Sequence, residues 1–387
     1  MRVAVVGLGS AGPALALLLA DAGHEVEVLE REPDPGPVGA GIWLQHLGQE
    51  VLDRLGLLDG LRAVSRPVDR VEGVTVSGRT VMDFGYADLP GATPALGVNR
   101  GALFSLLHRA LLGSAARVRT GVTVTGVRPA AGGAVVETGA GDLGPYDLVV
   151  GADGSRSVVR AALGVTRRDR AYGYGALWAV VEDPEGVAGS VLHQCFDGTR
   201  RYFGVLPTGI GQASVFWSVP TAAATARDPA GWRAEAARFA GRYSPLLANV
   251  ETLLPATYRD VAVSTPYRLA AGAAAVLVGD AAHAMSPQLG AGTSLALADA
   301  WVLAEELTGD QPLASALAAY ARRRAAHWRW YRLWTRAMVP AFQSDLDALA
   351  APRDLLAGPV GRVPWIRAQA VATLVGDRTS PWTRVGL

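Results

Sequence analysis

The chain has 387 residues, half of them hydrophobic, and a formal net charge of +1. A hydrophobic share of this size supports a large core and argues against a disordered chain. The near-neutral charge argues against nucleic acid or an anionic membrane as a partner. Because the length exceeds that of a usual single domain, we expect two interlocked domains. The only cysteine, Cys195, excludes an intrachain disulfide and a cysteine-built metal site, so no metal is expected.

The sequence also bears on the location of the protein. No apolar run approaches the ~20 residues of a membrane-spanning helix, so no transmembrane segment is expected. The first residues imitate an export signal, but Gly7, Gly9, Gly12 and Pro13 interrupt the apolar stretch. A lone cysteine suits reducing conditions, and we therefore expect a cytoplasmic protein.

Residues 1–30 predict a strand, a helix and a second strand. Residues 2–6 form a β-branched run typical of a buried parallel strand. Residues 13–23 carry leucines at helical spacing and end in a glycine, as many helices do. Residues 25–29 return as a second strand. This order is that of a nucleotide-binding βαβ unit.

Three glycines follow the first strand at the G-x-G-x-x-G spacing. Gly7 permits a tight turn, Gly9 lets the backbone approach a pyrophosphate, and Gly12 allows close packing of helix on strand. The N-terminus of the helix would offer free N–H groups to the phosphates. Glu30 ends the second strand, where an acid accepts hydrogen bonds from the adenosine ribose.

The same glycine pattern recurs at residues 139–144, where its meaning differs. Pro145 and a strand follow it instead of a helix. We therefore predict a hairpin turn at this position. The chain then has one nucleotide-binding unit, which argues against a dedicated second Rossmann domain for NADPH.

Two later strands end in short polar turns. Residues 146–154 read as a strand that ends in Asp-Gly, and residues 273–280 as a strand that ends in Gly-Asp. A carboxylate beside a glycine can accept hydrogen bonds from the hydroxyls of a polyol. Residues 290–294 then open a helix, whose positive end would favour a reduced, anionic flavin ring.

Together these segments resemble the para-hydroxybenzoate hydroxylase-like family of FAD monooxygenases, often called group A. The family carries the glycine fingerprint, a Gly-Ala-Asp-Gly-x-x-Ser-x-Val-Arg motif and a Gly-Asp-Ala-x-His-x-x-x-Pro motif. This chain has all three in order, at 7–12, 151–160 and 279–287, and the resemblance covers essentially residues 1–330. It implies an α/β fold with a Rossmann-like FAD-binding domain, an inserted β-sheet substrate domain and a helical C-terminal region.

The resemblance also implies limits for these parts. We expect the FAD-binding domain at 1–73, 97–175 and 265–330, the substrate domain at 74–96 and 176–264, and the helical region at 331–387. Within the substrate domain, alternating residues predict strands at 176–182, 190–196, 202–207 and 212–219.

The family motifs assign cofactor contacts to positions of this chain. By similarity, Asp280 would bind the ribityl chain of FAD, and Glu30 and Arg31 would lie at the adenosine end. Arg100 would lie near the phosphates, and Asp153 and Gly154 match a motif associated with FAD and the nicotinamide cofactor. The residues expected at the cofactor are Gly7, Gly9, Ser10, Ala11, Gly12, Glu30, Arg31, Gly41, Arg100, Val124, Asp153, Gly154, Asp280, Pro287, Gly290, Ala291, Gly292 and Thr293.

The chain departs from the family pattern at two places. After Pro287 the family commonly has Gly-Gln-Gly-x-Asn, whereas this chain has Gly-Ala-Gly-Thr at 290–293. The Glu-Asp pair usual on the next helix is reduced to Ala298-Asp299. Both departures put side-chain contacts in doubt and leave backbone contacts to FAD possible.

Candidate substrate contacts come from the predicted sheet, where the family places its substrate. Trp178, Phe203 and Trp217 are the ring-bearing candidates, although most such residues in a strand belong to the core. His193 is a candidate acid or base, but a lone histidine in a strand, like His283 in the third motif, is more often structural. Pro287 is expected beside the flavin.

The activity implied by the resemblance depends on the flavin. NADPH or NADH would reduce FAD, and O₂ would add at C4a to give a hydroperoxide that hydroxylates or epoxidises an electron-rich aromatic or polyketide-like molecule. Tailoring of a natural product is one setting for this reaction. The alternatives are an FAD-dependent oxidase or reductase of the same fold, or a non-catalytic flavin-binding redox sensor.

The C-terminal part reads as helical after about residue 312. Arginines at 322, 329, 332 and 336 share one helical face, and tryptophans at 330 and 334 lie on another. We interpret this as a solvated basic face with aromatics packed inward, rather than a nucleic-acid site. The apolar residues 338–375 would cover the substrate cavity, touch a membrane surface or form a dimer seam, so a monomer and a homodimer both remain open.

Overall fold

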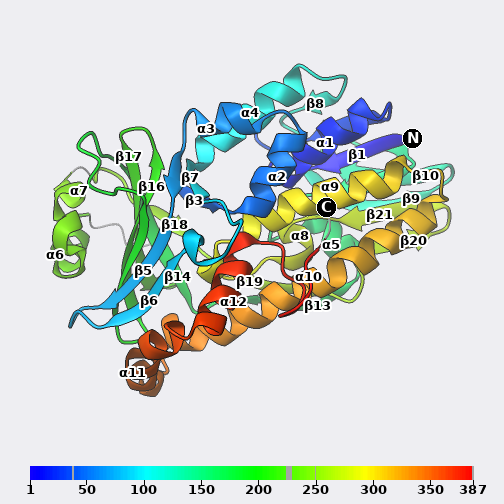
Figure 1. The fold of residues 1–387 in the computed structure, drawn as a ribbon. Coiled ribbons are helices and arrows are strands. Elements are labelled where there is room, and N and C mark those ends of the chain that lie inside the picture. Colours follow the sequence, from blue (N-terminus) through cyan, green and yellow to red (C-terminus); the bar gives the residue numbers. More distant parts are fainter. Residues whose placement is uncertain (37–38, 224–228, 249, 386–387) are drawn as a thin grey trace.

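A computed structural model describes residues 1–36, 39–223, 229–248 and 250–385. Two sheet-based units lie side by side, and the long helix α10 (Leu313–Phe342) runs along both of them (Figure 1). No helix in these ranges is long and apolar enough to cross a membrane. The arrangement confirms the predicted α/β fold class with a helical C-terminal region.

The first unit is built on a mainly parallel sheet with strand order β20-β21-β12-β1-β2-β8. Its central strands are rich in valine and alanine and almost completely buried, as parallel strands covered on both faces are. The strands are β20 (Tyr267–Ala270), β21 (Ala273–Leu277), β12 (Leu148–Gly151), β1 (Arg2–Val6), β2 (Glu25–Leu29) and β8 (Arg117–Arg119).

Helices and a small sheet surround this parallel sheet. α1 (Ala11–Asp21) packs against α4 (Arg100–Leu112) and α9 (Gly292–Thr308). The antiparallel strands β9 (Val124–Ala130), β10 (Gly133–Thr138) and β11 (Leu143–Tyr146) pack on β12 and β21. Residues 139–142 join β10 to β11, so the hairpin predicted for the second glycine pattern is confirmed.

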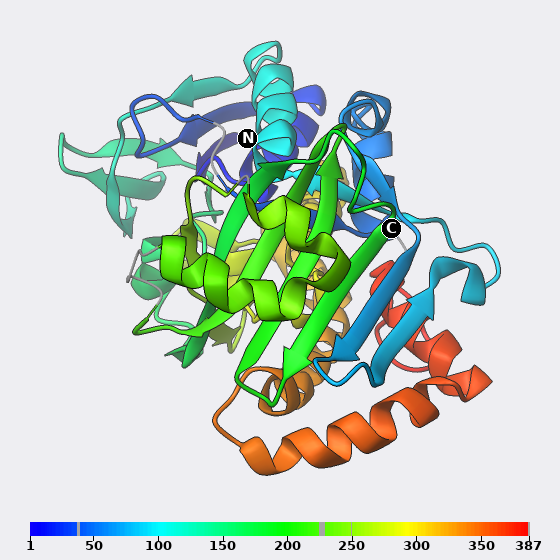
Figure 2. The same cartoon turned by 90° about the vertical axis from the view of Figure 1, so that its left-hand side faces the viewer.

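The second unit is a sheet with strand order β18-β14-β17-β16-β15-β5-β6. Helices α6 (Pro229–Ala240) and α7 (Ser244–Ala248) lie across one face of it, which we call the outer face (Figure 2). The strands are β18 (Leu254–Ala256), β14 (Tyr174–Glu182), β17 (Gln212–Pro220), β16 (Arg201–Gly209), β15 (Val191–Asp197), β5 (Arg70–Thr75) and β6 (Thr80–Gly85). The four strands predicted within 176–219 are all present, with small shifts at their ends.

Strand β5 begins at Arg70, four residues before the predicted start of the substrate domain at 74. The parallel pairing of Arg70 with Val191 of β15 draws this segment into the seven-stranded sheet. The domain limits given above otherwise stay a prediction.

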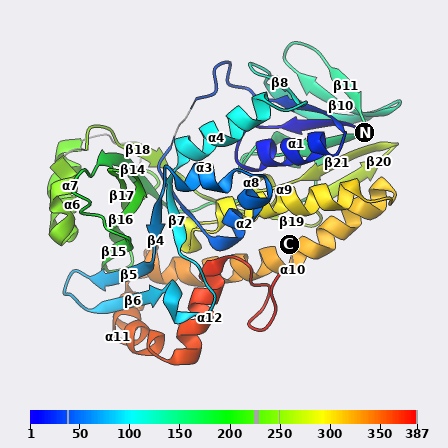
Figure 3. The same cartoon turned by 45° about the horizontal axis from the view of Figure 1, so that its top comes forward.

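Shorter elements complete the fold, and among them β4 and β7 lie between the two units (Figure 3). They are β3 (Gly41–Leu44), α2 (His46–Arg54), α3 (Leu58–Arg62), β4 (Arg66–Val68), η1 (Tyr86–Asp88), β7 (Ala95–Asn99), α5 (Val158–Leu163), β13 (Thr166–Ala171), η2 (Gly241–Tyr243), β19 (Arg259–Val263), α8 (Asp280–His283) and η3 (Pro287–Leu289). Strands β3 and β4 pair with β7, and β13 pairs with β19.

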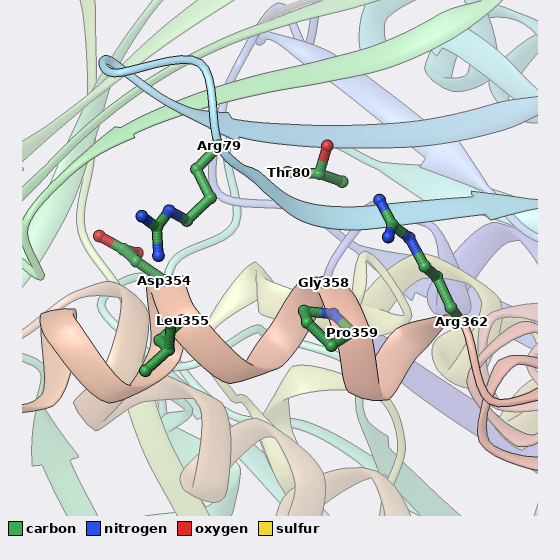
Figure 4. Close-up of a pocket in the computed structure, with 7 residues that line it drawn as sticks. All are labelled: Arg79, Thr80, Asp354, Leu355, Gly358, Pro359 and Arg362. Carbon is green, nitrogen blue, oxygen red and sulfur yellow. The ribbon is translucent and has the colours of Figure 1, made fainter.

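The C-terminal helices lie along the second unit. After η4 (Asp347–Leu349), helix α11 (Ala350–Gly361) packs on β6, where a Cβ at Gly358 would overlap with the carbonyl oxygen of Thr80. Figure 4 shows the hollow between these two elements. Helix α12 (Pro364–Val375) buries Val371 and Val375 in the core, whereas Leu355 of α11 stays exposed.

The predicted inward packing of the α10 aromatics is wrong for one of the two tryptophans. Trp334 is 43% exposed, and its ring meets that of the partly buried Trp330 edge-on at 5.7 Å. Arg336 is not merely solvated, because it forms an ion pair with the buried Asp260 at 2.8 Å. Trp334 is two positions before Arg336 and lies about 200° from it around the helix axis, so it faces away from the side that pairs with Asp260.

Candidate functional site

Four parallel strands end beside one another, and each is followed by residues of a sequence motif. β1 pairs with β2 and with β12, and β12 pairs with β21. Their carboxyl ends therefore bring together Gly7, Glu30, Asp153 and Asp280. In open parallel sheets, ligands bind outside the carboxyl ends of the strands.

The glycine loop after β1 has the geometry that its spacing predicts. Gly7 has φ +107°, and a Cβ there would lie 2.5 Å from the carbonyl oxygen of Ala152. A Cβ at Gly12 would overlap with the carbonyl oxygen of Gly7. A Cβ at Gly9 would meet nothing within 4 Å, so the backbone there is open to a ligand. Helix α1 begins immediately after, at Ala11, with Ser10 at its N-cap position.

Glu30 has a structural task that the sequence reasoning missed. Its carboxylate accepts hydrogen bonds from the backbone N–H of Leu8 at 2.9 Å and of Glu32 at 3.0 Å. It therefore ties the glycine loop to the end of β2. Arg31 is exposed and forms an ion pair with Glu32 at 3.3 Å. Contacts of Glu30 and Arg31 with adenosine stay a prediction.

Asp280 presents a carboxylate without a partner. Its side chain is exposed, and no donor among the described residues forms a hydrogen bond with it. Crowding by surrounding protein raises the pKa of Asp280, while the charges of His283 and Arg100 act in the opposite direction. An open backbone at Gly9 and a free acceptor at Asp280 fit a ligand with a pyrophosphate and sugar hydroxyls, as FAD has.

Asp153 is placed differently from Asp280, because the protein itself uses its carboxylate. It accepts hydrogen bonds from Ser157 Oγ at 2.5 Å and from the backbone N–H of Val158 at 2.8 Å and Val159 at 3.2 Å. It thus caps α5. Burial raises the pKa of Asp153, although these hydrogen bonds oppose the shift. Gly154 beside it has φ +79° and open space around it.

Arg160 joins the second motif to the third. Its guanidinium, 2% exposed as a residue, donates to the carbonyl oxygens of Ala281 at 2.9 Å and Ser155 at 2.8 Å and pairs with Asp169 at 2.8 Å. We did not assign a role to Arg160 from the sequence. The one feature of the sequence that could have indicated this role is the position of Arg160 as the last residue of the second motif.

The loop before α9 supplies mainly backbone. Gly290 has φ +60°, and a Cβ there would lie 2.6 Å from the ring of Trp43. Pro287 is exposed, and Gly292, where α9 begins, has open space around it. Ala291 is buried and Thr293 partly exposed. These positions agree with backbone contacts to the cofactor, which stay a prediction.

Three predicted cofactor residues lie outside the strand-end turns, and their contacts with FAD stay a prediction. Arg100 begins α4 and is exposed, and its side chain lies against Gly39. Gly41 begins β3, where a Cβ would lie 2.7 Å from Ser214 Oγ. Val124 begins β9 and is buried.

The doubt about Asp299 is resolved by its hydrogen bonds. The carboxylate accepts from the backbone N–H of Gly279 at 2.7 Å and from Nε2 of His283 at 2.6 Å. His283 and Asp299 are 1% and 0% exposed. Both side chains therefore support residues 279–283, which we call the Gly-Asp turn, from inside the protein.

The predicted substrate residues separate onto two faces of the sheet. The register aligns Trp217 with Phe203 and with Leu177, and this row is buried on the outer face under α6. Trp178 is aligned with Phe216 on the opposite, inner face and is only partly buried. Phe203 and Trp217 are therefore core residues, and only Trp178 remains a candidate for substrate contact.

His193 also belongs to the outer face. Its Nδ1 lies 3.0 Å from Glu72 Oε2, and its ring lies 4.7 Å from that of Tyr243 in η2. Arg242 bonds both Glu72 and the Tyr243 hydroxyl. This cluster lies across the sheet from Trp178, so His193 is not placed to exchange protons with a substrate on the inner face.

Replacing His193 by glutamine is expected to change the pH dependence of stability and not that of turnover. Burial lowers the pKa of His193, although Glu72 opposes the shift. The unfolded chain therefore binds a proton at about pH 6.5 that the folded chain does not, so stability present above that pH is lost as pH falls. Urea unfolding at mildly acidic and neutral pH should show that the variant loses less stability than the wild type when the pH falls. A variant that lost a limb of its pH–turnover profile would instead make His193 catalytic.

These features define the protein as an α/β protein with a nucleotide-binding geometry at the carboxyl ends of a parallel sheet. The chain belongs to the family described as FAD binding domain, whose sequence model matches residues 1–332. It is 33% identical over 325 residues to aurachin C monooxygenase/isomerase of Stigmatella aurantiaca, with 83% of this chain and 84% of the relative covered. It is 31% identical over 335 residues to the FAD-dependent urate hydroxylase of Klebsiella pneumoniae, with 84% and 86% covered.

A solved structure agrees with the fold. The crystal structure of Klebsiella pneumoniae HpxO complexed with FAD and uric acid matches with a TM-score of 0.81 at 24% identity, with 97% of each chain covered. The comparisons confirm the predicted family, FAD as the cofactor and the class of oxidoreductase.

Proposed function

We propose that this protein is a monooxygenase that uses FAD, O₂ and NADPH or NADH to hydroxylate or epoxidise an electron-rich aromatic or polyketide-like molecule without a carboxylate. The observation that carries the proposal is the pair of an FAD-type site at the strand ends and an aromatic inner face beside it. The names of the relatives support the monooxygenase reaction on a ring, since they include aurachin C monooxygenase/isomerase, urate hydroxylase and kynurenine 3-monooxygenase. The preference for a ring without a carboxylate is argued from the inner face alone.

The protein's own residues would bind and orient the two reactants. The open backbone at Gly9 and the carboxylate of Asp280 would hold the pyrophosphate and ribityl parts of FAD, with Arg100 nearby. Bound FAD supplies the electrons and the activation of O₂. Residues of the inner face would hold the aromatic ring and exclude water.

The inner face has the composition of an apolar aromatic wall. Trp178 stacks near Phe216 at 4.8 Å between ring centres, and its Nε1 donates to the Tyr258 hydroxyl at 3.3 Å. Burial raises the pKa of Tyr258 to about 12, so this hydroxyl stays protonated. Phe216 belongs to a buried hydrophobic cluster in which this face packs against other elements. Its other members are Trp43, Val68, Val71, Val81, Tyr86, Ala95, Leu192, Phe196, Tyr202, Leu206, Phe342, Val371 and Val375, with Met338 and Leu374 partly buried beside them.

Within the part of the chain that the structure describes, the wall has no free counter-charge for an anionic substrate. Among the described residues, the cation recorded over its rings is Arg353, at 5.3 Å from Phe196 and 5.2 Å from Phe342. Arg353 is already bound to Asp354 and to the carbonyl oxygen of Ala341. An ionised carboxylate buried without a partner costs several kcal/mol, so a neutral ring is favoured over its carboxylated counterpart.

The direct test compares neutral and carboxylated rings of one shape. NADPH or NADH oxidation would be followed with a hydroxyquinoline and a naphthol, each beside its carboxylated counterpart. The neutral rings should stimulate oxidation and O₂ uptake about tenfold or more over the acids, which corresponds to roughly 1.4 kcal/mol. Preference for the acids would contradict the neutral substrate class. Failure of both nucleotides with every ring would instead favour an oxidase, a partner-fed reductase or a redox sensor.

Two tryptophans on adjacent strands provide matched variants for this assay. Trp178→Ala should raise the KM of the stimulating ring about tenfold through lost contact. Trp217→Ala on the outer face should cost roughly 3–5 kcal/mol of stability and leave the KM of the folded fraction unchanged. An unchanged KM in Trp178→Ala would remove the inner face from the substrate site.

Three further features complete the proposal. A role in natural-product tailoring is supported by the likeness to aurachin C monooxygenase/isomerase and to the 3-amino-4-hydroxybenzoate 2-monooxygenase of Streptomyces cremeus. A cytoplasmic location is supported by the single cysteine, Cys195, which is buried and free. A monomer or a homodimer is proposed as the working state, since α11 leaves Leu355 and Leu356 exposed.

A further inference from the structure

Asp299 is the centre of a buried polar cluster behind the Gly-Asp turn. Besides Gly279 and His283, its carboxylate accepts hydrogen bonds from Arg324 Nε at 2.7 Å and from Trp328 Nε1 at 3.0 Å. Burial alone would raise the pKa of Asp299, but the charges of His283 and Arg324 hold this pKa at about 2. The carboxylate is therefore a fixed anion at every pH at which the protein is used.

The cluster extends through Arg324 to the C-terminal segment, which we define as residues 373–376. Arg324 Nη1 donates to Nδ1 of His327 at 2.6 Å, and Nε2 of His327 donates to the carbonyl oxygen of Gly376 at 2.8 Å. A guanidinium has no acceptor, so the ring of His327 is neutral with its hydrogen on Nε2. Burial, and then the charge of Arg324, lower the pKa of His327 well below its usual value.

The Gly-Asp turn depends on this support because its first residue has an unusual backbone. Gly279 has φ +60° and ψ −142°, a conformation that residues with a Cβ rarely adopt. Its N–H is held by Asp299. Asp280 follows Gly279 directly. The direction of the Asp280 carboxylate therefore depends on the backbone that Asp299 anchors at the Gly279 N–H.

The C-terminal segment also contacts the other end of the same loop. The Tyr331 hydroxyl donates to the carbonyl oxygen of Thr373 at 2.7 Å. Gln45 Nε2 donates to the carbonyl oxygen of Leu289 at 2.5 Å, and a Cβ at Gly376 would lie 3.3 Å from Gln45 Oε1. Residues 279–289 are thus supported from both ends by side chains that meet at the C-terminal segment.

We infer that Arg324 and His327 are positioning residues for FAD, which transmit the placement of the C-terminal segment through Asp299 to Gly279 and Asp280. Neither side chain needs to touch the cofactor. Their contribution is a rigid turn whose Asp280 carboxylate already has the direction that binding requires, so less ordering is needed when FAD binds. The inference rests on FAD binding by the family site and is independent of the substrate.

The test measures release of FAD from the full-length holoprotein. Flavin fluorescence after dilution would give the dissociation rate for Arg324→Met, His327→Leu and His327→Gln. Arg323→Met is the matched control, because Arg323 also joins α10 to α9, through ion pairs with Glu305 at 2.8 Å and Glu306 at 2.9 Å, and does so at the surface. Hydrogen exchange of the Gly279 amide in the same samples reports on the turn itself.

The inference predicts about tenfold or faster FAD release in Arg324→Met and His327→Leu, with faster exchange at Gly279. His327→Gln keeps an N–H for Gly376 and should restore slow release, and Arg323→Met should stay within about twofold of the wild type. Two results would overturn the inference: equal release rates in Arg324→Met and Arg323→Met, or release from His327→Gln as fast as from His327→Leu. If Arg324→Met does not fold, the histidine pair decides.

Discussion

Gly9→Val is expected to yield a folded protein that binds FAD at least about 100-fold more weakly, a loss of roughly 2.8 kcal/mol. A side chain at Gly9 meets no protein atom within 4 Å, so it leaves the fold unchanged and occupies the space through which a pyrophosphate approaches. Gly12→Val should behave differently, because its Cβ overlaps with the backbone of Gly7. Overpacking at such a site costs roughly 3 kcal/mol, so both stability and FAD binding should fall.

Thermal unfolding without added flavin and FAD titration together separate these two effects. Gly9→Val should have the unfolding temperature of the wild type but a lower affinity for FAD. Gly9→Ala provides a milder variant that should lie between the wild type and Gly9→Val in affinity. Equal FAD affinity in Gly9→Val and the wild type would mean that the glycine loop is not the pyrophosphate site.

Asp280→Ala is expected to weaken FAD binding about 10- to 100-fold, roughly 1.4–2.8 kcal/mol, without loss of stability. The protein gives this carboxylate no hydrogen bond and raises its pKa by crowding, so its removal costs the fold nothing. Asp153→Ala is the matched comparison within the second motif. It should lose about 1–2 kcal/mol of stability, because Asp153 caps α5.

Urea unfolding of the two variants, followed by FAD titration of each, tests this contrast. The expected pattern is a functional loss in Asp280→Ala and mainly a structural loss in Asp153→Ala. The reverse pattern would show that the free acceptor at the end of β21 does not serve the cofactor. It would then transfer the cofactor contact to the turn after β12.

Local patterns in the sequence predicted the part of the site that local geometry determines. The tight turn at Gly7, the open backbone at Gly9 and the close packing at Gly12 follow from spacing within a single βαβ unit. The second glycine pattern was distinguished from the first by Pro145, and the hairpin there agrees. Four strands of the second unit, β14 to β17, were found because their β-branched and aromatic residues are interrupted by clear turn residues, whereas β5, β6 and β18 were not predicted.

Contacts between distant residues were beyond the reach of the sequence. Arg324 lies on α10 and Asp299 on α9, and His327 of α10 contacts Gly376, which follows the end of α12. No sequence periodicity relates residues on different helices. The sequence also could not predict which side chains of a strand point to which face of the sheet. Strands β16 and β17 are buried on both faces and therefore lack the alternation of polar and apolar residues that marks a solvent-exposed face. Phe203 and Trp217 were therefore indistinguishable from Trp178 until the register and the helices over the outer face were known.

Transfer of one oxygen atom from O₂ to an aromatic ring is the central claim, and isotope labelling tests it most directly. The FAD-loaded protein would be supplied with NADPH or NADH, the most strongly stimulating neutral ring and heavy-oxygen O₂, and the product would be analysed by mass spectrometry. The account predicts one heavy oxygen atom in the product and the other in water. An oxidised product that carries no heavy oxygen, with all O₂ recovered as hydrogen peroxide, would contradict the account and identify an oxidase.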